Sequence, residues 1–232
     1  MIKTNLFLLF IFVSGHALAQ STDEFALRYQ QTAGNQSILF YGNLQAARHP
    51  AMNHPYFVSR QYGSARLSYR GVVYPEVMLR LDLQRHELII LSSEGLHFVL
   101  VPEYVDYAIL HDHRIIYISN GDLPTGYYVV LHSGDFPVLK RTNARLVNVQ
   151  QGANVYVQFI FPTVYYLYKD GVYHTIRNRR ALLSILHQHR RELRQFLAAN
   201  RWLNFRHNPG QLILHTVVEY ERLRALEATP LS

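Results

Sequence analysis

His111, Asp112 and His113 form the pattern best suited to metal chemistry in this chain. Histidines two residues apart on a strand point to the same face, and imidazole nitrogen is a common zinc ligand. A site would need a further ligand, for which the chain offers His97, Glu103, Asp106 and His132. The same tripeptide also suits a turn between two strands, with both histidines in water. The turn is the preferred interpretation, and a metal-assisted hydrolase that uses His111 and His113 is the alternative hypothesis.

Eight arginines between residues 177 and 206 form the second candidate site. Glu192 is the only acid in this segment, whereas residues 20–176 carry equal numbers of basic and acidic side chains. Ion pairs within the segment therefore cannot neutralise it, and its field attracts anions. Planar guanidinium groups bind carboxylate and phosphate through two parallel hydrogen bonds, which ammonium groups cannot do. We expect an anionic partner to dock on Arg179, Arg180, Arg190, Arg191 and Arg194.

Two other catalytic patterns are missing from the sequence. The chain has no cysteine, which excludes thiol catalysis, thiolate zinc sites, iron–sulfur clusters and disulfides. It also has no G-x-S-x-G segment of the kind that presents a nucleophilic serine. We therefore expect no cofactor, and a binding or accessory protein in preference to an enzyme.

The first 19 residues have the layout of a secretory signal peptide. Lys3 precedes the apolar run 6–13, and Ala17-Leu18-Ala19 fits a small-x-small cleavage site. The run is far shorter than the roughly 20 residues that span a bilayer. Because no cysteine follows the cleavage site, the mature chain cannot carry a lipid anchor. We expect a periplasmic or extracellular protein that does not span the membrane, with a flexible leader over residues 20–36.

Export also limits the kinds of anionic partner that the arginine segment can meet. In a cytoplasmic protein, charge clustered as it is in residues 177–206 would indicate nucleic acid. In an exported protein, an anionic component of the cell envelope or the acidic face of another protein fits better, and nucleic acid is not expected. Burial must stabilise the fold without disulfides, and the hydrophobic fraction of 49% is sufficient for a packed core.

Residues 37–177 have the composition of an antiparallel β domain. β-Branched and aromatic residues occur in short runs, and the connections are too short for the crossovers that parallel strands need. Asp170-Gly171 is the clearest two-residue turn. We expect about 11–12 short strands in a meander-type barrel or sandwich, and both alternatives stay open. The predicted strands are residues 37–41, 65–69, 72–83, 87–91, 96–101, 105–110, 114–119, 127–132, 136–141, 155–161, 164–168 and 172–176.

Residues 178–227 change to a helical period. Apolar residues recur at steps of three and four from Leu182 to Leu197, which is typical of a helix with one buried stripe. Asn178 is a suitable N-cap for this helix. A second helix is expected to begin at Pro209, after a capping Asn208. The two helices should pack on the β domain, and residues 228–232 should form a loose tail.

Three segments carry a resemblance to known proteins: residues 71–82 (GVVYPEVMLRLD), 126–134 (GYYVVLHSG) and 165–173 (YYLYKDGVY). Followed by a basic helix, this layout resembles a group of uncharacterised exported proteins of Bacteroidota-type bacteria, over roughly residues 37–225. The segments consist of strand and turn residues. The resemblance therefore implies export and a β domain that precedes helices, and it implies no activity.

Overall fold

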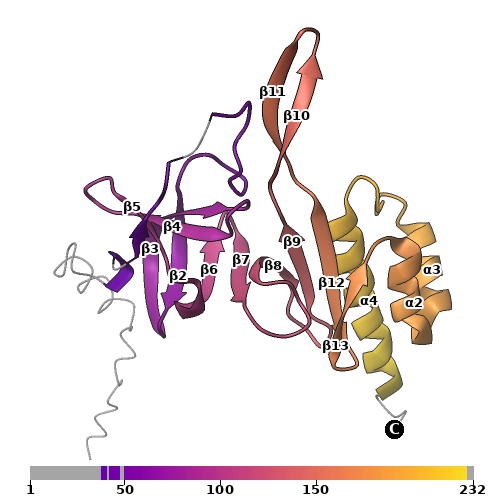
Figure 1. Cartoon of the computed structure of the whole chain (residues 1–232). Coiled ribbons are helices and arrows are strands. Elements are labelled where there is room, and N and C mark those ends of the chain that lie inside the picture. Colours follow the sequence, from indigo (N-terminus) through magenta and orange to yellow (C-terminus); the bar gives the residue numbers. More distant parts are fainter. Residues whose placement is uncertain (1–37, 41, 48–49, 229–232) are drawn as a thin grey trace, which may run out of the picture.

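The protein is mainly β with C-terminal α elements, as the sequence predicts (Figure 1). The computed structural model describes residues 38–40, 42–47 and 50–228. The predicted signal peptide (1–19) and leader (20–36) lie outside the described residues, as do positions 229–232 of the predicted tail. The strands of the described part are β1 (Asn43–Leu44), β2 (Gly63–Tyr69), β3 (Val72–Asp82), β4 (Glu87–Leu91), β5 (His97–Val99), β6 (Val105–Leu110), β7 (His113–Ile118), β8 (Gly126–His132), β9 (Val138–Thr142), β10 (Arg145–Gln151), β11 (Asn154–Ile160), β12 (Thr163–Lys169) and β13 (Val172–Ile176).

Eleven of these strands form one sheet, in the order β1-β5-β4-β3-β2-β6-β7-β8-β9-β12-β13. All neighbouring pairs in it are antiparallel. The order leaves β1 and β13 as two edges, so the sheet is an open meander and not a closed barrel. β10 and β11 form a separate two-stranded sheet, which rises from the body as an arm (Figure 1).

The strand bounds follow the sequence pattern where β-branched and aliphatic residues dominate. β4, β6 and β13 begin and end at the predicted residues. The predicted strand over residues 37–41 is wrong, because Ile38–Phe40 form the 3₁₀ turn η2 instead. The sequence prediction also missed β10, since asparagine and glutamine interrupt its apolar pattern.

β3 shows how period-two alternation divides the sheet into two faces. On one face of its second half, and at the residue after it, the apolar side chains are at most 6% exposed: Val77, Leu79, Leu81 and Leu83. On the opposite face, Met78 is exposed, but Asp82 is fully buried. The Asp82 carboxylate accepts hydrogen bonds from the backbone N–H groups of Gln84 and Arg85, at 2.9 and 3.0 Å. A buried carboxylate is stable here because the following turn satisfies it.

The helical region contains three α-helices and not the predicted two. The helical elements of the described residues are η2, η3 (Pro102–Tyr104), α2 (Arg179–Ile185), η4 (His187–His189), α3 (Arg190–Ala199) and α4 (Pro209–Ala228). Asn178 caps α2 as predicted, and its side-chain oxygen accepts from the backbone N–H of Ala181 at 2.8 Å. The helix expected to continue from there breaks because Leu186 and His189 leave the α-helical region of backbone angles.

α4 begins at Pro209 as predicted, but the preceding Asn208 side chain does not turn toward it. Its oxygen accepts from the backbone N–H of Asn204 at 2.7 Å, and its amide donates to the Trp202 carbonyl at 3.0 Å. Asn208 therefore fixes the loop between α3 and α4. The competing backbone groups of this loop explain why the side chain is not available as a helix cap.

The three helices pack against one face of the sheet at its β8-β9-β12-β13 end (Figure 1). The apolar stripe predicted for residues 182–197 faces this core, and Leu182, Leu186 and Leu193 are fully buried in it. From the sheet, Val138 and Leu167 complete the cluster. Within residues 38–40, 42–47 and 50–228, we find no helix long and apolar enough to cross a membrane.

Candidate functional site

The predicted arginine site lies on α2 and α3, at the side of the molecule farthest from β5 (Figure 1). Arg179 and Arg180 open α2, and their side chains are exposed. Arg191 and Arg194 on α3 are exposed, and Arg190 is half-buried. Within the described part of the chain, no side chain forms a hydrogen bond or an ion pair with any of these five arginines.

The spacing of the α3 arginines places them side by side. Successive residues of a helix are about 100° apart, so Arg190, Arg191 and Arg194 share an arc of about 100°. Like charges three and four residues apart destabilise a helix by roughly 0.2–0.5 kcal/mol for each pair. The apolar face of the same helix buries Leu193 and Leu197. α3 thus presents a basic surface. Its arginines repel one another, and a bound anion would reduce that repulsion.

The neighbouring acids on α4 are already engaged elsewhere. Glu227 lies 3.3 Å from His189 Nε2, and Glu219 accepts two hydrogen bonds from Arg222, at 2.8 and 2.7 Å. The Arg222 hydrogen bonds lower the pKa of Glu219 from its ordinary value. Among the described residues of α2 and α3, this leaves Glu192 as the one acid against five arginines.

The histidine motif occupies a tight turn. His111 and Asp112 have φ values of 50° and 61° and connect β6 to β7, where Leu110 pairs with His113. The His111 ring lies close to Gly63, whereas the His113 ring packs edge-on against Phe57, with centroids 5.4 Å apart. The two histidines therefore have different surroundings. In the described ranges, no group of three His, Cys, Asp or Glu side chains could hold a metal ion.

The four other potential ligands do not join the histidine turn, and Glu103 among them lies on η3. His132 Nε2 lies 2.8 Å from both carboxylate oxygens of Glu221, and His97 Nδ1 lies 2.5 Å from the Tyr62 hydroxyl. The Asp106 carboxylate accepts from Ser68 Oγ and from the Gly71 N–H. Burial is the largest cause that lowers the pKa of His113, and Lys140 adds to it.

The sequence predicts β11, as the strand over residues 155–161, but not the arm that it forms with β10. No charged residue occurs from Leu146 to Tyr168, and several large apolar side chains of the arm are exposed: Leu146, Val155, Tyr156, Val157 and Ile160. A loop from the body pairs with the outer edge of β11. The Met52 N–H donates to the Val157 carbonyl at 2.9 Å.

Asn53 fastens the same loop to the arm through both ends of its side-chain amide. Its nitrogen donates to the Phe159 carbonyl at 2.9 Å, and its oxygen accepts from the Phe159 N–H at 2.7 Å. The side chain thereby replaces the backbone groups of a neighbouring strand. The Phe159 ring is 5% exposed and belongs to the main core, so the foot of the arm is anchored in the body.

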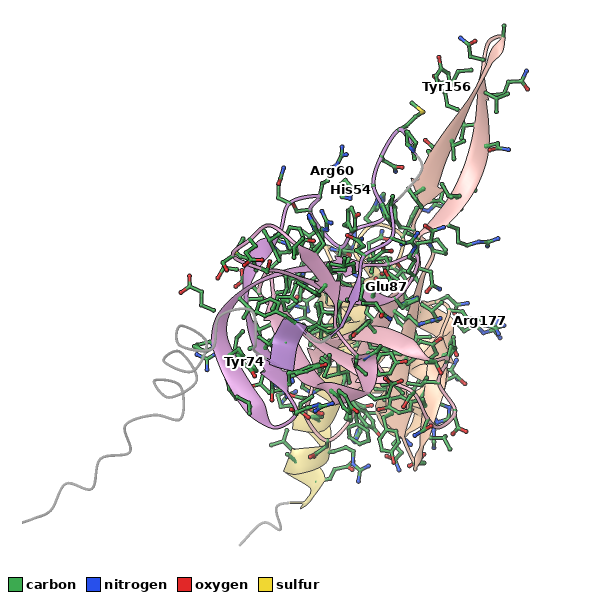
Figure 2. All side chains as sticks on the ribbon, turned by 60° about the vertical axis from the view of Figure 1, so that its left-hand side comes forward. His54, Arg60, Tyr74, Glu87, Tyr156 and Arg177 are labelled. Carbon is green, nitrogen blue, oxygen red and sulfur yellow. The ribbon has the colours of Figure 1, made fainter. Side chains whose placement is uncertain are left out.

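A pocket of about 460 Å³ lies at this foot of the arm. The residues of its wall that matter for binding are Asn53, His54, Tyr56, Arg60, Arg80 and Phe159. Figure 2 shows His54 and Arg60 on the side of the body from which the arm rises, while Arg177 lies apart from them. In the sequence, the loop that lines this pocket is marked by Pro50 and Pro55, which do not fit a central strand.

Arg80 on β3 is the most constrained side chain of the pocket. Its guanidinium carbon lies 4.0 Å from the ring centroid of Tyr56 and 4.2 Å from that of Tyr62. Nη1 donates to the Arg60 carbonyl at 3.0 Å, and Nη2 donates to Gln45 Oε1 at 3.1 Å and to the Tyr62 hydroxyl at 3.2 Å. Burial raises the pKa of Tyr62, and the positive charge of Arg80 opposes that shift.

Comparison with protein-family models, with curated proteins and with solved structures finds no match for this chain. The resemblance to exported Bacteroidota-type proteins stays a prediction. The function is therefore inferred from the geometry and charge of the chain itself.

Proposed function

We propose that this protein is an exported, non-enzymatic binding module of the cell envelope that docks on an anionic envelope component. The observation that supports the proposal is the exposure of Arg179, Arg180, Arg191 and Arg194, none of which has a carboxylate partner among the described residues. An acid three or four residues from an arginine on the same helix would pair with it. On α2 and α3 only Glu192 is available, against five arginines.

The mechanism is charge attraction followed by bidentate hydrogen bonds. The unbalanced charge raises the local concentration of anions and speeds association. On contact, guanidinium groups form paired hydrogen bonds with carboxylate or phosphate oxygens. Acidic polysaccharide and anionic lipid head groups both provide these oxygens. Because the arginines are exposed, salt should screen the interaction over a Debye length of about 8–10 Å.

Export is part of the same proposal and rests on the signal-peptide pattern of residues 1–19. An exported chain meets envelope anions and not nucleic acid, which is why envelope components are the proposed partners. The acidic face of another protein is the competing partner, and it becomes an outcome of the test below.

Reversing three arginines should abolish binding to envelopes. The test compares the mature chain from Gln20 with a variant in which Arg190, Arg191 and Arg194 are changed to Glu. Each basic residue near an anionic surface contributes about 1 kcal/mol, so loss of three should weaken binding roughly 100-fold. The measurement is co-sedimentation with washed cell envelopes in a series of salt concentrations.

The wild-type chain should sediment with the envelopes at low salt and appear in the supernatant as the salt concentration rises. Protease treatment of the envelopes separates the partners, since binding to polysaccharide or lipid survives it and binding to an acidic protein does not. Equal sedimentation of wild type and variant, or binding that persists in concentrated salt, would contradict the proposal.

A further inference from the structure

The pocket at the foot of the arm contains two arginines, and no carboxylate of the described residues forms an ion pair with either. We propose that this pocket binds a small, ring-bearing organic anion. In this site, Arg60 and Arg80 hold the carboxylate or phosphate group, and the stacked pair of His54 and Tyr56 contacts the body of the ligand. The volume of about 460 Å³ falls within the range of small-molecule sites, about 300–1,000 Å³.

Arg80 has the properties of a prepared anion receptor. Its guanidinium group is held between the rings of Tyr56 and Tyr62, so little rotamer freedom remains to be lost on binding. Its three hydrogen bonds go to neutral acceptors, which leave its charge uncompensated. Its Nε atom is buried and has no hydrogen-bond partner among the described residues. A buried donor without a partner is costly, so the guanidinium group is still short of one acceptor.

Arg60 completes the basic side of the pocket. Its backbone carbonyl accepts from Arg80 Nη1, so the two residues are fixed next to each other. Its own side chain is exposed and lines the same pocket. The Arg80 guanidinium group is held in place and the Arg60 side chain is exposed, so both can bind a single oxyanion from different sides.

The aromatic part of the pocket explains why the ligand should carry a ring. The rings of His54 and Tyr56 are stacked, with centroids 5.9 Å apart and an interplanar angle of 25°. Phe159 of β11 also lines the pocket, although most of its ring is buried in the core. Flat aromatic side chains offer contact area at a low cost in conformational entropy. Sugar rings and aromatic rings bind to such surfaces, whereas a bare inorganic anion makes no use of them.

This inference does not depend on the basic surface of α2 and α3. The pocket is built from the loop at residues 50–60, from β3 and from the arm, and none of its residues lies on the helices. A substitution in one of the two sites can therefore abolish binding there and leave binding at the other site unchanged.

The test measures binding of glucose 6-phosphate, glucuronate, glucose and inorganic phosphate to the purified protein by isothermal titration calorimetry. We expect both ring-bearing anions to bind more tightly than glucose and inorganic phosphate. Arg60→Gln should weaken their binding about 10- to 100-fold, the range for loss of a charge-assisted hydrogen bond. Arg145→Gln, at an exposed arginine of the arm outside the pocket, is the matched control and should change binding less than twofold.

Arg80→Lys tests the guanidinium geometry, since it keeps the charge and removes the planar fork; a loss of about tenfold or more is expected. Arg60 is exposed, so its substitution leaves the core intact. If the Arg80 variant unfolds, the binding measured for Arg60→Gln still tests the proposal. The proposal is overturned if neither ring-bearing anion binds at millimolar concentrations, or if Arg60→Gln and Arg145→Gln behave alike. It is also overturned if glucose or inorganic phosphate binds as tightly as glucose 6-phosphate.

Discussion

Replacing Ile213 with alanine should lower the free energy of unfolding by roughly 2–5 kcal/mol, the range for truncating a buried isoleucine. Ile213 is 0% exposed, at the point where α4 faces Val138 and Leu167 of the sheet. The loss combines the transfer energy of the removed methyl and methylene groups with the cavity that they leave. Urea unfolding at neutral pH measures the change.

Val218→Ala is the matched control on the same helix. Its side chain is 45% exposed, so the same kind of truncation should change the free energy of unfolding by less than about 0.5 kcal/mol. Alanine has the highest helix propensity, so neither change breaks α4. Similar, small effects of the two substitutions would show that the helices do not share a core with the sheet.

Replacing Glu221 with glutamine should lower the free energy of unfolding by roughly 1.5–3 kcal/mol, as expected for hydrogen bonds to a charged group. The Glu221 carboxylate lies 2.8 Å from His132 Nε2 and accepts the Phe136 N–H at 3.0 Å. These bonds join α4 to the segment that connects β8 and β9. Glutamine keeps the shape and the Oε1 acceptor that both contacts share, but it removes the charge, so the remaining hydrogen bonds are neutral and weaker.

Glu219→Gln provides the comparison within two residues of the same helix. Glu219 pairs with Arg222, which is 57% exposed, and exposed pairs of this kind contribute about 0.2–1 kcal/mol. A double-mutant cycle with His132→Gln measures the coupling directly. If the Glu221 substitution costs no more stability than the Glu219 substitution, or shows no coupling with His132, the claim that Glu221 links α4 to the sheet is contradicted.

The parts of the fold that the sequence predicts are those governed by local pattern. β4 and β13 could be bounded from their β-branched runs, and Asn178 could be recognised as a helix cap from its position before the apolar stripe. β10 could not, because Asn148 and its two glutamines interrupt the apolar pattern and its pairing with β11 decides its conformation. The break at Leu186 likewise depends on how two helices fit the same sheet.

The two candidate sites also differ in whether a local sequence pattern predicts them. The arginines of α2 and α3 could be predicted, because charge adjacent in sequence stays adjacent on a helix. The arm pocket could not be predicted, because it joins His54 in a loop, Arg80 on β3 and Phe159 on β11, which are brought together only by the fold. No local sequence pattern indicates that these three residues lie close together in the fold.

The most direct measurement compares two variants that lose equal charge at different places. In the first, Arg190, Arg191 and Arg194 are changed to Gln; in the second, the exposed Arg66, Arg114 and Arg145 of the strands are changed to Gln. Co-sedimentation of each mature chain with washed envelopes at a single moderate salt concentration gives the result. We predict that the helix variant loses binding and that the strand variant keeps it. Equal loss in both would show that net charge, and not the surface of α2 and α3, attracts the envelope.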